Sequence, residues 1–178
     1  MTATPAVAAP FLAAAVVLAG AGVAKMWRPD YTARAVQATG LRIAGRRPGR
    51  WWVRAGAAAE LVIAVLAVAL PNQVTGALVA AAYGAFATFV LAALARGWSL
   101  SSCGCFGRPD SKPGYPHVAL NAGAAVAAVW WAVQAPGRIG PFFVHQPWHG
   151  LPLALLAAVI AGLAYLIWTN PLAMEEAA

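Results

Sequence analysis

The sequence predicts an all-α fold, a polytopic integral membrane bundle of about five transmembrane helices. Hydrophobic residues make up 62% of the 178-residue chain and charged residues only 10%, and the mean hydropathy is +0.70. Soluble domains average about 25% charged residues. The apolar residues fall in continuous blocks, and no block alternates as the strand of a membrane barrel would. We therefore expect the lipid bilayer to be a partner of most of the chain.

Five apolar blocks approach or reach the roughly 20 residues that a helix needs to span hydrocarbon. The first block has no basic residue before it, whereas Lys25 lies at its end and Arg28 follows it. A cleaved signal peptide has the opposite charge order, so we expect a retained helix with its N-terminus outside. Runs of small residues at 20–22 and 56–59 suit close helix packing in lipid. The five predicted spans are residues 6–26, 52–70, 74–95, 118–135 and 151–169.

The connections between these blocks differ in character. Residues 31–41 carry apolar side chains at helical spacing, which predicts a short interfacial helix between the first two spans. The turn Pro71-Asn72 is so short that the second and third spans should form an antiparallel hairpin. Residues 97–116 are rich in Ser, Gly and Pro, which excludes a long helix there. We expect a constrained loop at the membrane surface.

The net charge of +7 is unevenly distributed. Eight of the 12 basic residues, from Lys25 to Arg54, lie on the connection between the first two spans or at the span ends that flank it, and three more, Arg96, Arg108 and Lys112, lie on the connection between spans three and four. The positive-inside rule places both connections in the cytoplasm, in a multi-pass protein of the inner or plasma membrane. The basic residues are a topology signal and a contact for anionic lipid. No nucleic-acid-binding module is present, so nucleic acid is not an expected partner.

The only two cysteines form the tripeptide Cys103-Gly104-Cys105 within the second basic connection. Gly104 permits the backbone angles that a tight disulfide ring between these positions requires. One interpretation is a redox-active dithiol, and another is a ligand pair for a soft metal. A structural loop disulfide, or two inert thiols near a helix end, is the alternative without a chemical role. The spacing favours reversible redox chemistry.

Glu60 is the acidic residue that the predicted spans must accommodate. It lies about nine residues into the second span, roughly 13 Å deep at 1.5 Å per residue. An acidic side chain near the midplane costs about 3 kcal/mol. Its own helix offers no Lys or Arg one turn away, so compensation must come from another helix, and Lys25 is the nearest candidate. Glu60 is either a proton acceptor or polar anchor for the redox loop, or a neutral or paired structural residue.

Three further polar residues bear on the site. Asn121, about one turn into the fourth span, is placed to hydrogen-bond across helices. His117 opens that span, where it could help to deprotonate a cysteine, and the helix N-terminus also favours a thiolate. His117 with the two cysteines offers too few well-spaced ligands for zinc, and the predicted topology puts His145 and His149 on the other side of the membrane. A metal site therefore ranks second to a redox role, and we assign no residue as a metal ligand.

Four features together resemble the MauE branch of the DoxX-like membrane proteins. They are residues 24–29 with the sequence Ala-Lys-Met-Trp-Arg-Pro, the acid Glu60, the string Cys103-Gly104-Cys105-Phe106-Gly107, and the following helix with Asn121. The resemblance covers about residues 6–135 and implies a four-helix unit over 1–135. Residues 136–178 would then add a loop, an extra transmembrane helix and a short acidic tail.

The resemblance also implies a function. Members of that family support maturation of methylamine dehydrogenase, whose small subunit carries many disulfides, alongside a thioredoxin-like partner. By this similarity Cys103 and Cys105 would be the exchanging thiols, with Gly104, Phe106, Gly107, His117, Glu60, Lys25 and Asn121 in support. Disulfide formation in an exported enzyme would call for the outer side of the membrane, whereas the basic residues place the cysteines inside.

We therefore expect a redox-associated membrane protein that relays thiol–disulfide exchange through Cys103 and Cys105, as an oxidoreductase or an accessory factor. The expected partner is a thioredoxin-like or disulfide-containing protein. No bound cofactor is predicted, although a quinone is a possible electron carrier. The alternatives are a non-catalytic scaffold for a redox partner and a copper- or zinc-handling membrane protein.

Overall fold

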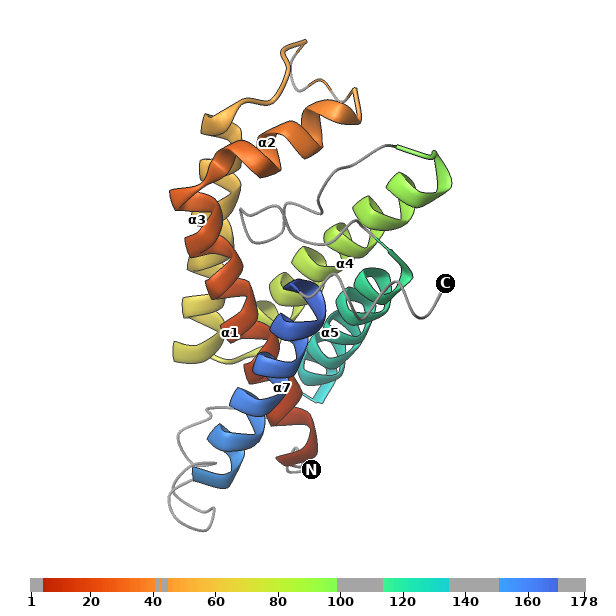
Figure 1. Cartoon of the computed structure of the whole chain (residues 1–178). Helices are drawn as coiled ribbons and strands as arrows, with labels where there is room; N and C mark the ends of the chain where they lie inside the picture. The colour runs from red at the N-terminus through yellow and green to blue at the C-terminus, as the bar shows by residue number, and fades with distance from the viewer. Residues whose placement is uncertain (1–4, 41, 43–44, 99–113, 135–150, 170–178) are drawn as a thin grey trace.

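The structure is a computed structural model that describes residues 5–40, 42, 45–98, 114–134 and 151–169. Every regular element in these ranges is a helix, as predicted (Figure 1). The helices are α1 (Pro5–Trp27), α2 (Pro29–Ala38), α3 (Arg50–Ala69), α4 (Gln73–Ala95), α5 (Tyr115–Gln134) and α7 (Leu151–Thr169).

Four of these helices, α1, α3, α4 and α5, are long and apolar enough to cross a membrane. The fifth predicted span is present as α7, whose apolar stretch Leu151–Ile167 is shorter than the other four. The prediction of an all-α polytopic membrane protein is therefore confirmed. Backbone hydrogen bonds within each helix satisfy the polar groups that hydrocarbon cannot solvate.

Helix α1 lies at the centre of the bundle. It contacts every other described helix, and its most apolar stretch is 61% buried, against 22–28% for the other three long spans. Its core side chains include Phe11, whose ring stacks on that of Trp131 from α5 at a centroid distance of 4.8 Å. Tyr83 of α4 donates from its hydroxyl to the carbonyl oxygen of Ala14 at 2.7 Å. The other helices are therefore organised around α1.

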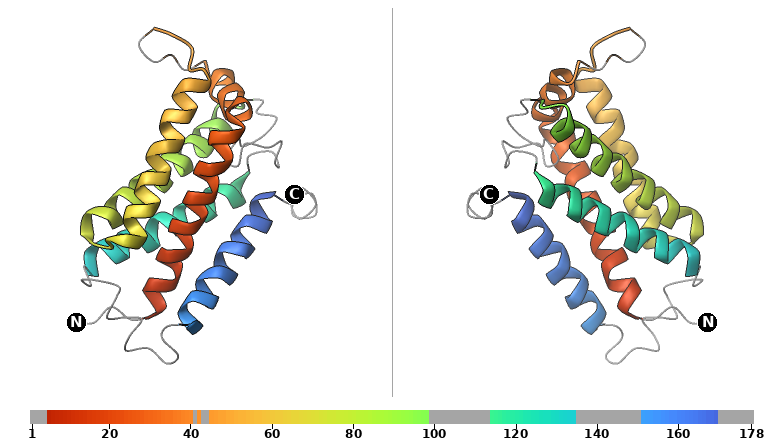
Figure 2. Two further views of the ribbon diagram at one scale, coloured as in Figure 1. Left: turned by 90° about the vertical axis from the view of Figure 1, so that its left-hand side faces the viewer. Right: turned by 90° about the vertical axis from the view of Figure 1, so that its right-hand side faces the viewer.

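Helices α3 and α4 are joined by the short turn that the sequence predicts, but they do not pair along their length. From the turn they diverge, so that α3 packs mainly on α1 and α4 packs mainly on α5 (Figure 2). The turn itself is held by a capping box, in which the Asn72 side chain accepts from the Thr75 amide at 3.0 Å and the Thr75 hydroxyl accepts from the Asn72 amide at 2.9 Å. These bonds satisfy amides that the start of α4 would otherwise leave unpaired.

Two glycines allow the closest helix contacts. A Cβ atom on Gly22 of α1 would lie 2.9 Å from Leu61 Cγ and 3.1 Å from the Ala57 carbonyl oxygen of α3. On Gly76 of α4 it would lie 3.0–3.1 Å from the backbone and Cβ of Ala132 on α5. At both positions the absence of a side chain lets the two helices of the pair pack closely, as small residues permit in lipid.

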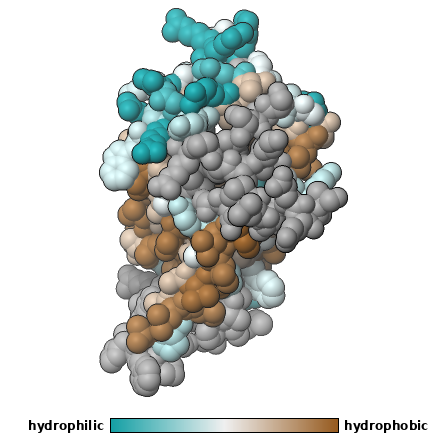
Figure 3. All heavy atoms as spheres, in the orientation of Figure 1, coloured by the Kyte–Doolittle hydropathy of each residue, from teal (hydrophilic) through white to brown (hydrophobic). Residues whose placement is uncertain are grey.

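The polar side chains gather at one end of the bundle, where α1 ends and α3 begins (Figure 3). Helix α2 lies there, and Asp30 of α2 is paired with Arg50 of α3. The sequence predicts the interfacial helix over 31–41, but α2 begins at Pro29 and ends at Ala38. A proline is well placed in the first turn, because its missing N–H would have no partner there.

A proline in the first turn also explains why α5 begins earlier than the sequence predicts. The sequence predicts this span from residue 118, with Pro116 in the preceding loop, whereas α5 begins at Tyr115. Pro116 lies in the first turn, where its ring causes no clash. The remaining predicted bounds differ from the observed ones by one or two residues, and α7 has the predicted bounds.

Candidate functional site

The motif Cys103-Gly104-Cys105 and the adjoining Phe106 and Gly107 lie outside the described residues, as do His145 and His149. The structure describes the two points where the chain leaves and re-enters the bundle around that motif. These points, together with the buried polar residues of the spans, make up the candidate site.

The chain leaves α4 through a fixed aromatic corner. Gly97 adopts φ = +60°, which only glycine takes up without strain, and turns the chain back so that the Trp98 amide donates to the Ala93 carbonyl at 3.0 Å. The Trp98 ring lies 6.5 Å from that of Phe89, and the Arg96 guanidinium lies 5.4 Å from its centroid. Trp98 is therefore held from two sides.

This corner also contacts the interfacial helix. Ala35 of α2 and Ala93 of α4 form a small buried cluster, with Phe89 and Trp98 packed against it. The departure point of the cysteine loop is thus fixed between α2 and α4. A Trp at the end of a span is typical of the membrane interface, but the sequence does not indicate the contact with α2.

The chain re-enters the bundle at α5, where the His117 amide donates to the Gly114 carbonyl at 3.0 Å. His117 is 1% exposed and Asn121 2% exposed, so both side chains belong to the interior. The Asn121 amide group donates to the His117 carbonyl at 2.7 Å. The predicted bond across helices is therefore replaced by a bond within α5, which uses the i−4 carbonyl of the same helix.

Lys25 and Glu60 form a buried ion pair in the apolar part of the bundle. Lys25 Nζ lies 2.5 Å from Glu60 Oε1, and the two side chains are 5% and 13% exposed. The pairing that the sequence predicts between the first two spans is therefore present. Because α1 and α3 approach closely at Gly22, one turn before Lys25, the ammonium group can reach the middle of α3.

A third helix contributes to this pair through an aromatic ring. Lys25 Nζ lies 4.7 Å from the centroid of Phe86 on α4, a cation–π contact. Phe86 in turn packs edge-to-face on Tyr83 at 6.0 Å. The sequence does not indicate this role of Phe86, because an isolated Phe in an apolar span carries no signal of its tertiary neighbours. The cluster of Lys25, Glu60 and Phe86 joins α1, α3 and α4.

Glu60 retains unused hydrogen-bonding capacity. Its second carboxyl oxygen, Oε2, is buried and has no hydrogen-bond partner among the described residues. A buried acceptor of this kind is costly unless a water or another donor reaches it. It gives the cluster one site that could accept a hydrogen bond or a proton.

The structure thus brings the predicted site residues together in two groups. Lys25 contacts Glu60, and His117 contacts Asn121; no hydrogen bond or ion pair joins one group to the other within the described ranges. The first group holds three spans together in their interior. The second group lies in the first two turns of α5, next to the point where the cysteine loop returns.

Comparison with known proteins assigns the chain to a family. The family model described as methylamine utilisation protein MauE matches residues 1–134. No curated protein and no solved structure matches. The matched region contains helices α1 to α5 with both polar groups and the cysteine motif. Because the match covers three quarters of the chain, this membrane protein belongs to the MauE family of methylamine utilisation proteins.

Proposed function

We propose that the protein exchanges thiols and disulfides with a partner protein through Cys103 and Cys105, in support of the maturation of a disulfide-containing enzyme. The observation that carries this proposal is the placement of the only two cysteines one glycine apart, in a single connection of a MauE family chain. The fixed ends of that connection at Trp98 and Gly114 also support it, because they limit how far the motif can lie from the bundle.

The proposed reaction moves two electrons. A thiolate of one cysteine attacks a sulfur of the partner's disulfide, which releases one partner thiolate and forms a mixed disulfide. The second cysteine then attacks its neighbour's sulfur and releases the second partner thiolate. The pair ends as an intramolecular disulfide and the partner as a dithiol; the reverse sequence oxidises the partner. In the reverse direction the pair ends as a dithiol, and a quinone could accept the two electrons and two protons that are lost when the pair returns to the disulfide.

The described residues support this chemistry by position. His117 and the N-terminal turn of α5 lie where the connection that carries the cysteines re-enters the bundle. The positive end of a helix dipole favours a nearby thiolate. The cluster of Lys25, Glu60 and Phe86 is the polar anchor that holds α1, α3 and α4 in register. In the proposed orientation the chain crosses the plasma membrane with the motif on the cytoplasmic side, where a thioredoxin-like protein can reach it.

Trapping of the mixed disulfide tests the proposal. Replacement of Cys105 by Ser should leave Cys103 without its resolving thiol, so that a reductant-sensitive adduct with the partner accumulates in membranes. The Cys103→Ser variant is the matched counterpart, and the double Cys→Ser variant is the control without thiols. Absence of an adduct in both single variants would reject thiol exchange and favour a scaffold that only holds a redox partner.

A further inference from the structure

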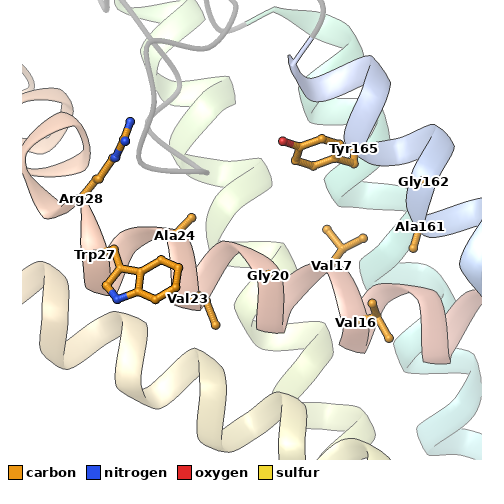
Figure 4. Close-up of a pocket in the computed structure, with 10 residues that line it drawn as sticks. All are labelled: Val16, Val17, Gly20, Val23, Ala24, Trp27, Arg28, Ala161, Gly162 and Tyr165. Carbon is orange, nitrogen blue, oxygen red and sulfur yellow. The ribbon is translucent and has the colours of Figure 1, made fainter.

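A groove of about 610 Å³ runs between α1 and α7. Figure 4 shows that its walls are the outward face of α1 from Val16 to Arg28 and the facing side of α7 around Tyr165. Most of the wall is apolar. This face of α1 points away from the Lys25–Glu60 pair, so the groove is distinct from the site described above.

Two glycines leave the groove open. A Cβ atom on Gly20 of α1, or on Gly162 of α7, would have no atom within 4 Å. At Gly22 and Gly76 a neighbouring helix occupies the space that a side chain would take, whereas at Gly20 and Gly162 that space is empty. Both helices are apolar, and α1 is long enough to span the membrane. The open volume therefore has the character of a ligand site with apolar walls, and it is suited to an acyl chain.

Among the described residues that line the groove, Arg28 at its mouth is the one with a positive charge. Arg28 directly follows α1 and is exposed, and Trp27 beside it is 82% exposed. The two acidic residues that the structure describes have other cations as partners, Asp30 with Arg50 and Glu60 with Lys25. The groove wall contributes no carboxylate among its described residues. A guanidinium in this position matches a phosphate group, and an exposed Trp is typical of the headgroup level.

We propose that this groove binds one phospholipid with an anionic headgroup. An acyl chain would lie along Gly20 and Gly162, and the phosphate would contact Arg28 at the basic end of the bundle. Anionic lipids are concentrated on the side of the membrane where basic residues gather. The lipid would fill the space between α1 and α7 and hold the C-terminal helix against the bundle.

Native mass spectrometry of the full chain in detergent tests the proposal, with phosphatidylglycerol and phosphatidylcholine as probes. The wild-type protein should retain one phosphatidylglycerol, with at least about tenfold preference over phosphatidylcholine. Arg28→Gln should abolish the preference, and Gly20→Leu should abolish retention of both lipids because the leucine occupies the groove. Gly162→Leu fills the same space from α7 and provides a second, independent variant.

Two substitutions serve as matched controls. Gly56→Leu introduces the same side chain on α3, at another glycine with open space around its Cβ, and Arg34→Gln removes an exposed charge that lies over Tyr31 instead of at the groove. Both should bind lipid like the wild type. Equal retention of the two lipids by the wild type, or unchanged retention in both leucine variants of the groove, would overturn the proposal. Retention of an added quinone but of no phosphatidylglycerol, abolished by Gly20→Leu, would also overturn it and assign the groove to a quinone.

Discussion

Lys25 and Glu60 are 35 positions apart in the chain, yet their charged groups touch inside the bundle. The sequence could predict this pairing, because Glu60 has no cation one turn away on its own helix and Lys25 ends the neighbouring span. It could not predict Phe86, which completes the cluster from α4. A charge in hydrocarbon requires a partner of opposite charge, and few residues can supply one. An aromatic ring can pack against many apolar residues, so the sequence does not indicate which of them it contacts.

The ion pair gives a prediction at the scale of single residues. Replacing Glu60 by Gln, or Lys25 by Met, leaves one buried charge without its partner and should lower the free energy of unfolding by about 3–5 kcal/mol. The double replacement removes both charges and should cost less than the sum of the two single changes. Reversible unfolding in mixed micelles would measure all three variants.

Asp30→Asn is the matched control for this prediction. It breaks the other ion pair of the described residues, with Arg50, in which the two side chains are 44% and 70% exposed. Exposed pairs contribute about 0–1 kcal/mol, so its effect should be small. Equal losses from Asp30→Asn and Glu60→Gln would contradict the role of the buried pair as an anchor.

The sequence could predict that the helices exist, but it could not predict where they contact each other most closely. Long apolar blocks indicate spans wherever they occur, because hydrocarbon admits few alternatives. The run of small residues at 20–22 suggests close packing, but it does not distinguish Gly22, which admits α3, from Gly20, which faces open space. That distinction depends on the rotation of α1, which neighbouring helices determine. Pro116 was similarly ambiguous, because a proline is tolerated both in loops and in first turns.

The contact between α4 and α5 gives a prediction for these two helices. Gly76→Ala places a methyl group 3.0 Å from Ala132 Cβ and 3.1 Å from the Ala132 backbone, which cannot move aside as a flexible side chain would. Overpacking of this kind should destabilise the protein by about 1–3 kcal/mol. Gly84→Ala lies in the same helix with nothing within 4 Å of the new methyl group and should have little effect. Thermal unfolding in detergent would compare the two, and equal stability would contradict close packing at Gly76.

For the whole molecule, the order of packing was the main feature that the sequence did not predict. The short turn at Pro71-Asn72 suggests that α3 and α4 pair, whereas α3 packs on α1 and α4 on α5. A short connection fixes only where two helices meet, and the side chains decide their crossing angle. The segregation of charge was predictable: hydrophilic residues gather at one end of the bundle (Figure 3), and the exposed Arg34 of α2 and Arg50 and Arg54 of α3 belong to the elements that meet there.

That segregation predicts the orientation in the membrane. Because both basic connections should face the cytoplasm, a membrane-impermeant thiol reagent should leave Cys103 and Cys105 unlabelled in intact cells. The same reagent should label them in opened, reduced membranes. A cysteine placed at Arg46 of the first connection, in a chain that lacks the native pair, is the control and should behave identically. Labelling of both positions in intact cells would reverse the orientation and move the partner to the outer side.

If Cys103 and Cys105 form a reversible redox couple, their oxidation state must change with the potential of the surrounding thiol–disulfide buffer. Membranes are equilibrated in thiol–disulfide buffers from about −150 to −300 mV, and the free thiols are then counted by alkylation. We predict a two-electron transition within this range, with a tenfold change in the oxidised-to-reduced ratio for about every 30 mV. A pair that remains fully thiol or fully disulfide at every potential would contradict the account.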